Sequence, residues 1–229
     1  MFNDYMALLV ESGPAILEGL LITLKLLAGS CAVGFVLSVP LAIARLSSRV
    51  GVRLCADAYS AVFRGTPLLV QIFIFYYGLS QFEMVRQSPA WLVLNDSFYC
   101  GLVVLSLNVT AYMAEDVRAG IIAVPKGEQE AALAYGLNKW QLYRYIVIPR
   151  ALTIATPALG NEVIALLKST ALVSTITVLD LTGVVRRLSA NAYTTDALIL
   201  AGVIYALITL LISACVRWME RRNAHHFSR

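Results

Sequence analysis

An acidic residue inside an apolar stretch is the first candidate for chemistry in this chain. Glu162 lies in a run of apolar residues, where an ionised carboxylate is costly unless it faces water, protein or a cation. Asn161 directly precedes Glu162, and Ser169 follows two helical turns later on the same helical face as Glu162. These groups could bind a polar solute. Alternatively, Glu162 pairs with Lys168 or with a neighbouring subunit, and the sequence leaves both interpretations open.

The chain lacks the residue patterns of common catalytic sites. It contains no G-x-x-x-x-G-K-[ST] phosphate loop, no paired-carboxylate site and no serine or cysteine nucleophile beside a base. Its four cysteines are widely separated, without a C-x-x-C pair or a histidine at zinc spacing, so we interpret them as small apolar residues. We therefore expect no enzymatic activity, no metal and no cofactor in this chain itself.

The composition indicates a lipid bilayer as the environment. Of the 229 residues, 59% are hydrophobic and 14% are charged, and the mean hydropathy is +0.74. A soluble domain of this size cannot bury so much apolar surface in one core. The net charge of +4 does not indicate nucleic-acid binding, because no basic face accompanies an aromatic platform. The sequence predicts an all-α, polytopic membrane protein with a single domain over residues 1–229.

Apolar runs predict about five transmembrane helices, since each span needs roughly 20 residues. The runs are Ile16–Ala44, Tyr59–Leu79, Phe98–Met113, Ala151–Leu181 and Ala197–Val216. Pro40 can kink the end of the first run, and Pro67 is expected to shape the helix of the second. The polar triplet of residues 168–170 could break the fourth helix, and irregular backbone there would need protein or water around it.

Lysine and arginine residues set the expected orientation, because they are enriched in cytoplasmic segments. They gather between the first and second runs, between the third and fourth runs, and after the fifth run. The N-terminal segment holds no basic residue but carries Asp4 and Glu11, unlike the basic start of a secretory signal. We therefore expect an N-terminus outside the cytoplasm and a C-terminus inside it.

The one long loop, residues 120–149, has a pattern that predicts two short helices. Pro125 suits a first helical turn, the alanines that follow favour helix, and Gly136 can end the helix in a left-handed turn. Asn138 can cap a second helix, whose apolar residues would hold it against the membrane before Pro149 starts the next span. The first helix would lie outside the bilayer as a compact element.

This loop also carries a family resemblance. Its pattern consists of Glu130, Ala131, Ala132, three residues, Gly136, nine residues, Ile146, one residue, Ile148 and Pro149. It resembles the EAA loop of ABC importer permeases, with Ile148 in place of the usual leucine. The resemblance implies the type I importer fold. It also implies that the short helix is a coupling helix that docks on a cytoplasmic ATPase, and that this partner binds ATP and Mg²⁺. The implied coupling residues are Glu130, Ala131, Ala132 and Gly136.

Three further stretches resemble one branch of these permeases, the polar amino acid group of histidine, glutamine and opine importers. They are residues 64–71, 111–115 and 159–168. In that branch, positions of the fourth span line a solute site, and many members have an acid where Ser169 stands, so this departure weakens selectivity for basic solutes. The candidates for the substrate pathway are Glu162, Ser169, Asn161 and Thr66. Gln71, Asn108 and Tyr112 could also touch solute, although helix packing is the expected role of such polar groups.

The resemblance implies a multisubunit importer in a bacterial inner membrane, surrounded by lipid. Its other parts would be a second permease subunit, identical or paralogous, a pair of cytoplasmic ATP-binding subunits and an extracytoplasmic solute-binding protein. The solute would be a polar or basic amino acid or an opine, moved by alternating access. A rival interpretation is an ion-coupled secondary amino acid transporter, which would place more ionisable groups at mid-membrane and would need no docking loop.

Overall fold

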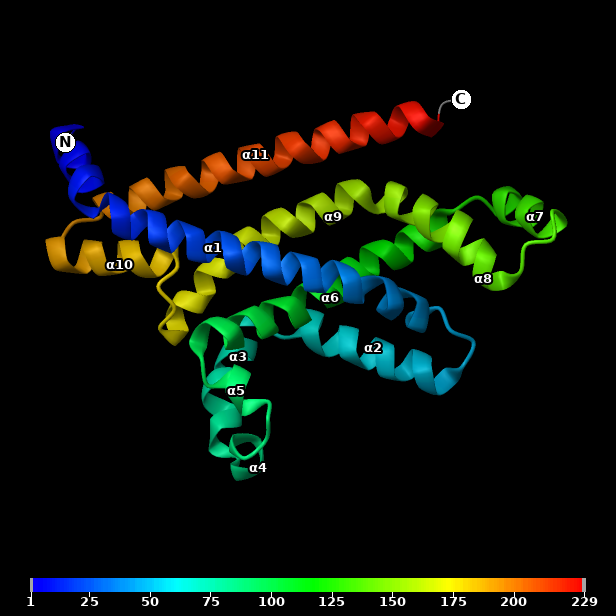
Figure 1. Ribbon diagram of the computed structural model, residues 1–229, viewed down its shortest axis with the longest axis horizontal. Coiled ribbons are helices and arrows are strands. Elements are labelled where there is room, and N and C mark those ends of the chain that lie inside the picture. Colours follow the sequence, from blue (N-terminus) through cyan, green and yellow to red (C-terminus); the bar gives the residue numbers. More distant parts are fainter. Residues whose placement is uncertain (1, 228–229) are drawn as a thin grey trace.

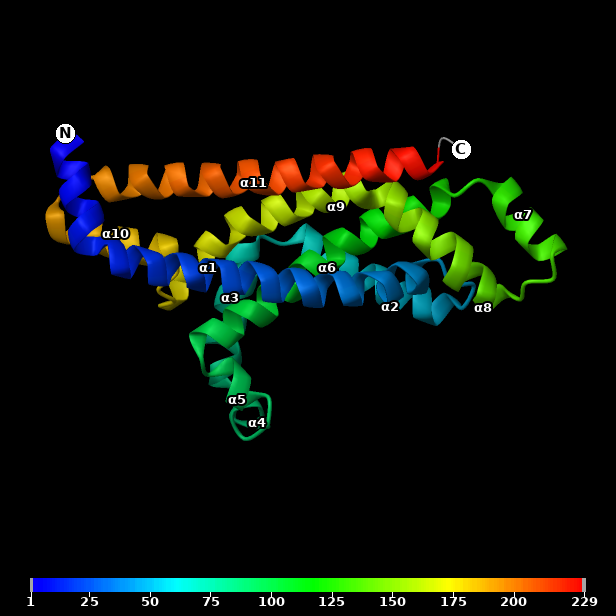
Figure 2. The same cartoon turned by 45° about the horizontal axis from the view of Figure 1, so that its top comes forward.

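The computed structural model describes residues 2–227, with side chains for residues 12–222. This part of the chain is helical and contains no strand. The long helices lie roughly along one axis, with the two ends of the chain at opposite ends of the bundle (Figures 1 and 2). These helices are α1 (Phe2–Arg45), α2 (Val50–Gly65), α6 (Ser97–Ala123), α9 (Ile148–Thr170) and α11 (Asp196–Phe227).

Short elements connect the long helices. Helices α2 and α6 are joined by α3 (Leu68–Phe73), a π-helical turn (Ile74–Gly78), a 3₁₀ turn (Leu79–Gln81), α4 (Glu83–Arg86) and α5 (Trp91–Leu94). Between α6 and α9 lie α7 (Lys126–Ala134), α8 (Lys139–Leu142) and a π-helical turn (Tyr143–Val147). A 3₁₀ segment (Ala171–Ile176) and α10 (Leu181–Ala192) lead from α9 to α11.

The prediction of about five spans in an all-α fold is confirmed. Within the described residues, four helices are long and apolar enough to cross a membrane: α1, α6, α9 with its flanking turns, and α11. A fifth is counted if α2 and residues 68–81 form one span, although the two halves are bent by 104°. Only 6% of the apolar stretch of α11 is buried inside the chain, so lipid or another subunit must cover it.

Helix α6 is the central element of the bundle. It packs along α1 and α9 and also contacts α2, and its Leu105 and Met113 side chains are almost fully buried. Gly120 permits the close approach of α9, since a Cβ atom there would lie 2.5 Å from the Ala151 carbonyl oxygen. The packing places one face of α6 between the bend of the second span and α9.

The fourth apolar run is not broken where the sequence suggested. Helix α9 continues through Lys168 and Ser169 to Thr170, and the geometry changes to 3₁₀ only at Ala171. The Thr170 hydroxyl donates to the carbonyl oxygen of Leu167 at 2.7 Å, so this polar side chain is satisfied inside the helix. Helix α1 likewise continues past Pro40 to its end at Arg45. The expected break in the fourth run is therefore wrong.

The sharp break lies in the second run, at Pro67. A helix through this point would pair the Phe63 carbonyl with the nitrogen of residue 67, but proline has no N–H. Two side-chain amides replace it: Gln71 Nε2 and Asn108 Nδ2 each donate to the Phe63 oxygen at 3.0 Å. Gln71 Nε2 also reaches the Thr66 carbonyl at 3.1 Å, and its Oε1 accepts from Asn108 at 3.0 Å. The expected shaping role of Pro67 and packing role of Gln71 agree with this geometry.

Replacing Gln71 with Met should destabilise the fold by about 2 kcal/mol, because carbonyl groups at the bend lose their donor while staying away from water. The midpoint of thermal unfolding in detergent measures this loss. Gln87→Met is the matched control, since Gln87 is an exposed residue that bonds Glu83 at 3.0 Å, and it should change stability by less than about 0.5 kcal/mol. Equal midpoints for the two variants would contradict this account of the bend.

Candidate functional site

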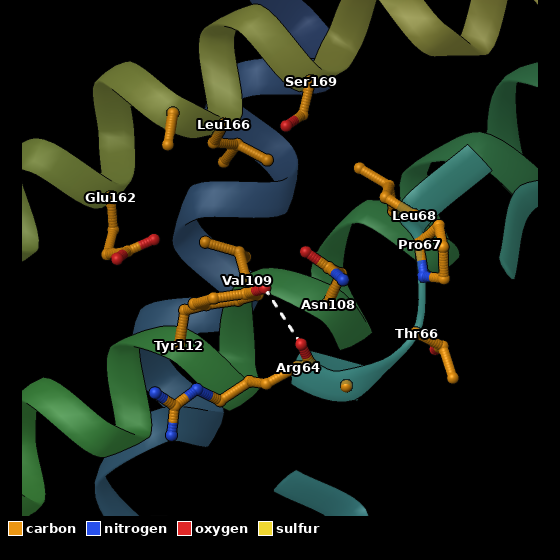
Figure 3. Close-up of a pocket in the computed structure, with 12 residues that line it drawn as sticks. Arg64, Thr66, Pro67, Leu68, Asn108, Val109, Tyr112, Glu162, Leu166 and Ser169 are labelled. Carbon is orange, nitrogen blue, oxygen red and sulfur yellow. Dashed lines mark hydrogen bonds between the residues drawn. The ribbon is translucent and has the colours of Figure 1, made fainter. Parts of the chain in front are cut away.

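A cavity of about 530 Å³ lies beside the bend, between the second span, α6 and α9. Figure 3 shows its polar side chains, which come from all three elements. They are Arg64 and Thr66 before the bend, Asn108 and Tyr112 on α6, and Glu162 and Ser169 on α9. The structure thus brings together three of the four residues that the sequence proposed for a pathway: Glu162, Ser169 and Thr66.

Glu162 and Ser169 line the cavity from α9. Within the described part of the chain, no hydrogen bond or ion pair engages the half-buried Glu162 carboxylate or the Ser169 hydroxyl. Lys168 is exposed and is not the partner of Glu162 here. Pairing of Glu162 with Lys168, one of the alternatives from the sequence, is therefore not observed.

The other two candidates behave differently. Asn161 is exposed but does not line the cavity, because consecutive residues of a helix point about 100° apart and Glu162 takes the inward position. Thr66 lines the cavity, yet its hydroxyl donates to the Val62 carbonyl at 2.8 Å and accepts from Gln71 at 2.8 Å. Its hydroxyl therefore serves the bend, and the cavity receives mainly its backbone and methyl group.

Asn108 and Tyr112 are cavity residues for which the sequence favoured a packing role. Asn108 uses its Nδ2 atom in the bend, while its oxygen end points toward the cavity (Figure 3). Tyr112 donates to the Arg64 carbonyl at 3.4 Å. Asn108 and Tyr112 are four residues apart, and this spacing predicts that they share one face of a helix. The sequence does not predict which neighbouring helices that face contacts.

Arg64 gives the cavity a positive group opposite Glu162. Its guanidinium carbon lies 5.5 Å from the centre of the Tyr112 ring, and its Nη1 atom lies 3.4 Å from a carboxylate oxygen of Glu115. Arg64 therefore pairs with an acid at the end of α2. The cavity is therefore lined by one cationic and one anionic side chain.

Glu115 is the centre of an ionic cluster that joins three helices. Its carboxylate accepts from Arg45 at the end of α1 and from Arg118 one turn along α6, and it pairs with Arg64 at the end of α2. Arg45 Nε also donates to Asp57 at 2.8 Å. Two of these partners, Arg45 and Arg118, belong to the basic segments next to the predicted spans, and Arg64 lies at the end of α2.

The two short helices that the sequence predicts within residues 120–149 are α7 and α8, while residues 120–123 end α6 and residues 148–149 begin α9. Helix α7 follows Pro125 and ends before Gly136, whose φ of +86° lies in the left-handed region. Asn138 and Gln141 form a reciprocal capping box at the start of α8, with both hydrogen bonds at 2.9 Å. Figure 1 shows α7 projecting beyond the long helices at the end of the bundle opposite the N-terminus.

The four residues of the loop motif divide between two faces. Glu130, Ala131 and Gly136 are exposed and accessible to a partner. Ala132 is buried in a cluster that includes Val124 and Leu142, so it holds α7 against its own chain. The role of all four residues in coupling stays a prediction.

Comparison with known proteins identifies the family. The family model described as "binding-protein-dependent transport system inner membrane component" matches residues 22–225. The chain belongs to this family. This membership confirms the resemblance to ABC importer permeases and places the permease among membrane components, as distinct from ATPase subunits.

Named relatives match the permease over nearly its whole length. It is 42% identical to the octopine transport system permease protein of Rhizobium radiobacter over 224 residues, which cover 95% of this chain and 91% of that protein. It is 41% identical to the histidine/lysine/arginine/ornithine transport system permease protein of Salmonella typhimurium strain LT2 over 215 residues, covering 92% of this chain and 90% of that protein.

Solved structures agree with the type I importer fold. A chain of an amino acid ABC transporter crystallised with histidines superposes with a TM-score of 0.81 at 36% identity, covering 93% of the permease and 96% of that chain. A chain of the inward-facing methionine transporter MetNI gives a TM-score of 0.79 at 18% identity, covering 93% and 98%. The second likeness concerns the fold alone.

Replacing Gly136 with Ala should weaken the turn after α7 by about 1 kcal/mol, because a left-handed backbone disfavours a residue with a Cβ atom. Space is open around Gly136, so this cost comes from the backbone alone. Amide hydrogen exchange of residues 126–142 should become faster. Gly127→Ala is the matched control, since its surroundings are also open and its φ is not positive. Unchanged exchange in Gly136→Ala would contradict the assigned turn.

Proposed function

We propose that this permease imports polar amino acids or opines through the cavity beside Pro67, in a complex driven by ATP hydrolysis on a partner subunit. The observation that carries the proposal is the pair of opposite charges, Arg64 and Glu162, lining one cavity of about 530 Å³ in the membrane domain. Cavities of this size suit small solutes. An amino acid or opine carries both a carboxylate and a cationic nitrogen, so it can complement both side chains.

The names of the relatives support this solute class. They include permeases for octopine, nopaline, arginine, and histidine with lysine, arginine and ornithine. Several of these solutes combine a carboxylate with a guanidinium or ammonium group. In the proposed pose, the free Glu162 carboxylate accepts from the cationic group, and Ser169 and the Asn108 oxygen complete the polar lining. Arg64 faces the carboxylate end.

Helix α7 is the proposed contact with the ATPase. Its exposed Glu130 and Ala131, together with Gly136, would enter a groove of an ATP-binding subunit, which would bind the ATP and Mg²⁺. Glu128 of α7 lies 3.4 Å from Arg150 near the start of α9, so the two helices are linked by an ion pair. A displacement of α7 would therefore reach α9, which carries Glu162.

The remaining parts of the proposed importer follow from the same arrangement. A second permease subunit, identical or paralogous, would cover the apolar surface that this chain leaves open and would close the pathway. A pair of ATP-binding subunits would lie at the α7 end, which would be cytoplasmic together with the C-terminus. A solute-binding protein would deliver the solute on the side of the N-terminus. Alternating access would then follow closure and opening of the ATPase pair.

The rival mechanism is ion-coupled secondary transport. Membership in a binding-protein-dependent family and the exposed α7 both favour ATP coupling. Reconstituted uptake that needs ATP and survives an uncoupler is the expected result. Uptake that survives without ATP and collapses with the uncoupler would support the rival.

The variant Glu162→Gln should slow uptake of arginine about tenfold, because a neutral amide loses the charge-assisted contact with the guanidinium. The measurement is ATP-dependent uptake by the complete importer in proteoliposomes, with co-purification of the subunits as the check of assembly. Glu220→Gln on α11 is the matched control, since Glu220 does not line the cavity, and it should transport normally. Unaltered kinetics in Glu162→Gln would remove this residue from the pathway.

Charge reversal in Glu130→Lys and the bulky replacement Gly136→Val should each weaken association with the ATPase by about tenfold or more, since they alter the charge and the turn at the docking surface. Association is measured by titrating purified ATPase into the detergent-solubilised permease, and uptake is measured in parallel. Glu83→Lys is the control, because Glu83 is an exposed acid in α4, far from α7 along the chain. Intact association and uptake in both variants would refute the coupling role.

A further inference from the structure

Another cavity, of about 320 Å³, lies at the end of the bundle that carries α7. It is lined from three elements: the end of α1, helix α8 with the π-helical turn after it, and the start of α9. Figure 1 shows α8 next to α7 at this end. The lining residues are Ile43, Lys139, Trp140, Tyr143, Arg144 and Ile148. None of them lines the cavity beside Pro67, so the two cavities are separate.

The α8 cavity lies where apolar spans end. Ile43 is in the last turn of α1, and Ile148 is the first residue of α9. The apolar helical stretch Lys139–Ile176 contains 38 residues, whereas a bilayer needs about 20. Part of this stretch must therefore lie outside the hydrocarbon. The part that begins at Lys139 suits the headgroup region, because charged and amphipathic aromatic side chains are enriched there.

Two cations at the α8 cavity have no acidic partner. Within the described part of the chain, neither Lys139 nor Arg144 forms an ion pair, and no acid lines the cavity. Both side chains are exposed. The guanidinium carbon of Arg144 lies 5.9 Å from the centre of the Tyr145 ring, so its neighbour is an aromatic ring and not a carboxylate. The positive charge is therefore available to an anionic ligand.

Exposed aromatic and aliphatic side chains complete this surface. Trp140 is 66% exposed and Tyr145 is 60% exposed, and their rings form an edge-on pair with centroids 6.1 Å apart. Such rings are enriched at bilayer surfaces, where one side of the ring is apolar and the other is wet. A ligand that fits must offer a negative group to the cations and hydrocarbon to the rings and isoleucines. A phospholipid with a negatively charged headgroup has both.

We propose that the α8 cavity binds an anionic phospholipid from the leaflet at the α7 end of the bundle. Its phosphate lies between Lys139 and Arg144, and its hydrocarbon contacts Ile43 and Ile148. Basic pockets between transmembrane helices bind anionic headgroups by the same combination of charge and apolar contact. Because α8 follows α7 in the chain, the bound lipid holds this loop at the bilayer surface. The inference goes beyond solute import, since it requires only that the α7 end meets a bilayer surface.

The test measures contact between lipid and Trp140 by fluorescence quenching. The full-length permease carries Trp91→Phe and Trp218→Phe, which leaves Trp140 as its one tryptophan, and is reconstituted in phosphatidylcholine vesicles with increasing fractions of a brominated lipid. Brominated phosphatidylglycerol should reach half-maximal quenching at about a tenth of the mole fraction that brominated phosphatidylcholine requires, because two cations face its headgroup. Adding Lys139→Gln and Arg144→Gln should abolish this preference.

Arg49→Gln with Arg53→Gln is the matched control for the loss of charge. It removes the same charge from exposed positions at the same end of the bundle, outside the lining of the α8 cavity. The preference for phosphatidylglycerol should therefore remain. An equal loss in both double variants would assign the preference to general surface charge and overturn the inference. Equal quenching by the two lipids before any charge is removed would also overturn it.

Two competitors distinguish lipid from other occupants. If inorganic phosphate at constant ionic strength, or the purified ATPase subunit, protects Trp140 from brominated phosphatidylglycerol, the cavity belongs to a free anion or to that subunit, and the inference is wrong. Protection by neither is the expected result. The assay contains no transported solute and no nucleotide, so its failure leaves the proposed function standing. The proposed function fails separately, if the complete importer carries no amino acid and no opine.

Discussion

The missing N–H of Pro67 is the constraint on which the rest of this structure depends. In a bilayer the Phe63 carbonyl cannot rely on water, so the fold must bring a donor to it. Gln71 supplies one donor from the next turn of the chain and Asn108 supplies another from the central helix. The same hydrogen bonds that satisfy the carbonyl therefore hold the second span bent by 104° and fix it against α6. The cavity lies beside this bend because the chain turns away there.

Charges in the helix bundle divide into a balanced and an unbalanced group. Glu115 is surrounded by the guanidinium groups of Arg45, Arg64 and Arg118, so its charge is compensated and serves to hold α1, α2 and α6 together. Glu162 has no ion-pair partner among the described residues, although it lies beside a cavity in a membrane-spanning helix. The compensated charge of Glu115 is explained by helix packing. The uncompensated charge of Glu162 beside a cavity would be stabilised by a cationic ligand. Arg64 pairs with Glu115 and also lines the cavity that Glu162 lines, so the cavity lies next to the ionic junction of the helices.

A short stretch of ordered chain links α7 to α9, the helix that lines the cavity beside Pro67. The turn at Gly136, the capping box at Asn138 and the π-helical turn at Tyr143–Val147 connect α7 to the start of α9 over a short stretch of ordered chain. Ala132 and Leu142 belong to one buried cluster with residues of α6, so these elements pack against the end of the bundle. The short helix thus has one face committed to its own chain and another face open to a partner. This division suits an element that transmits force.

The sequence by itself determined the features that depend on local chemistry. The apolar runs, the helix that follows Pro125, the left-handed turn at Gly136 and the cap at Asn138 follow from hydropathy, backbone geometry and hydrogen bonding within a few residues, and the loop motif was enough to indicate the family. Tertiary structure decided which polar groups meet. It turned Glu162 inward and Asn161 outward, and gave Glu115 three arginine partners, because these outcomes depend on which helix face meets a neighbour far away in the chain.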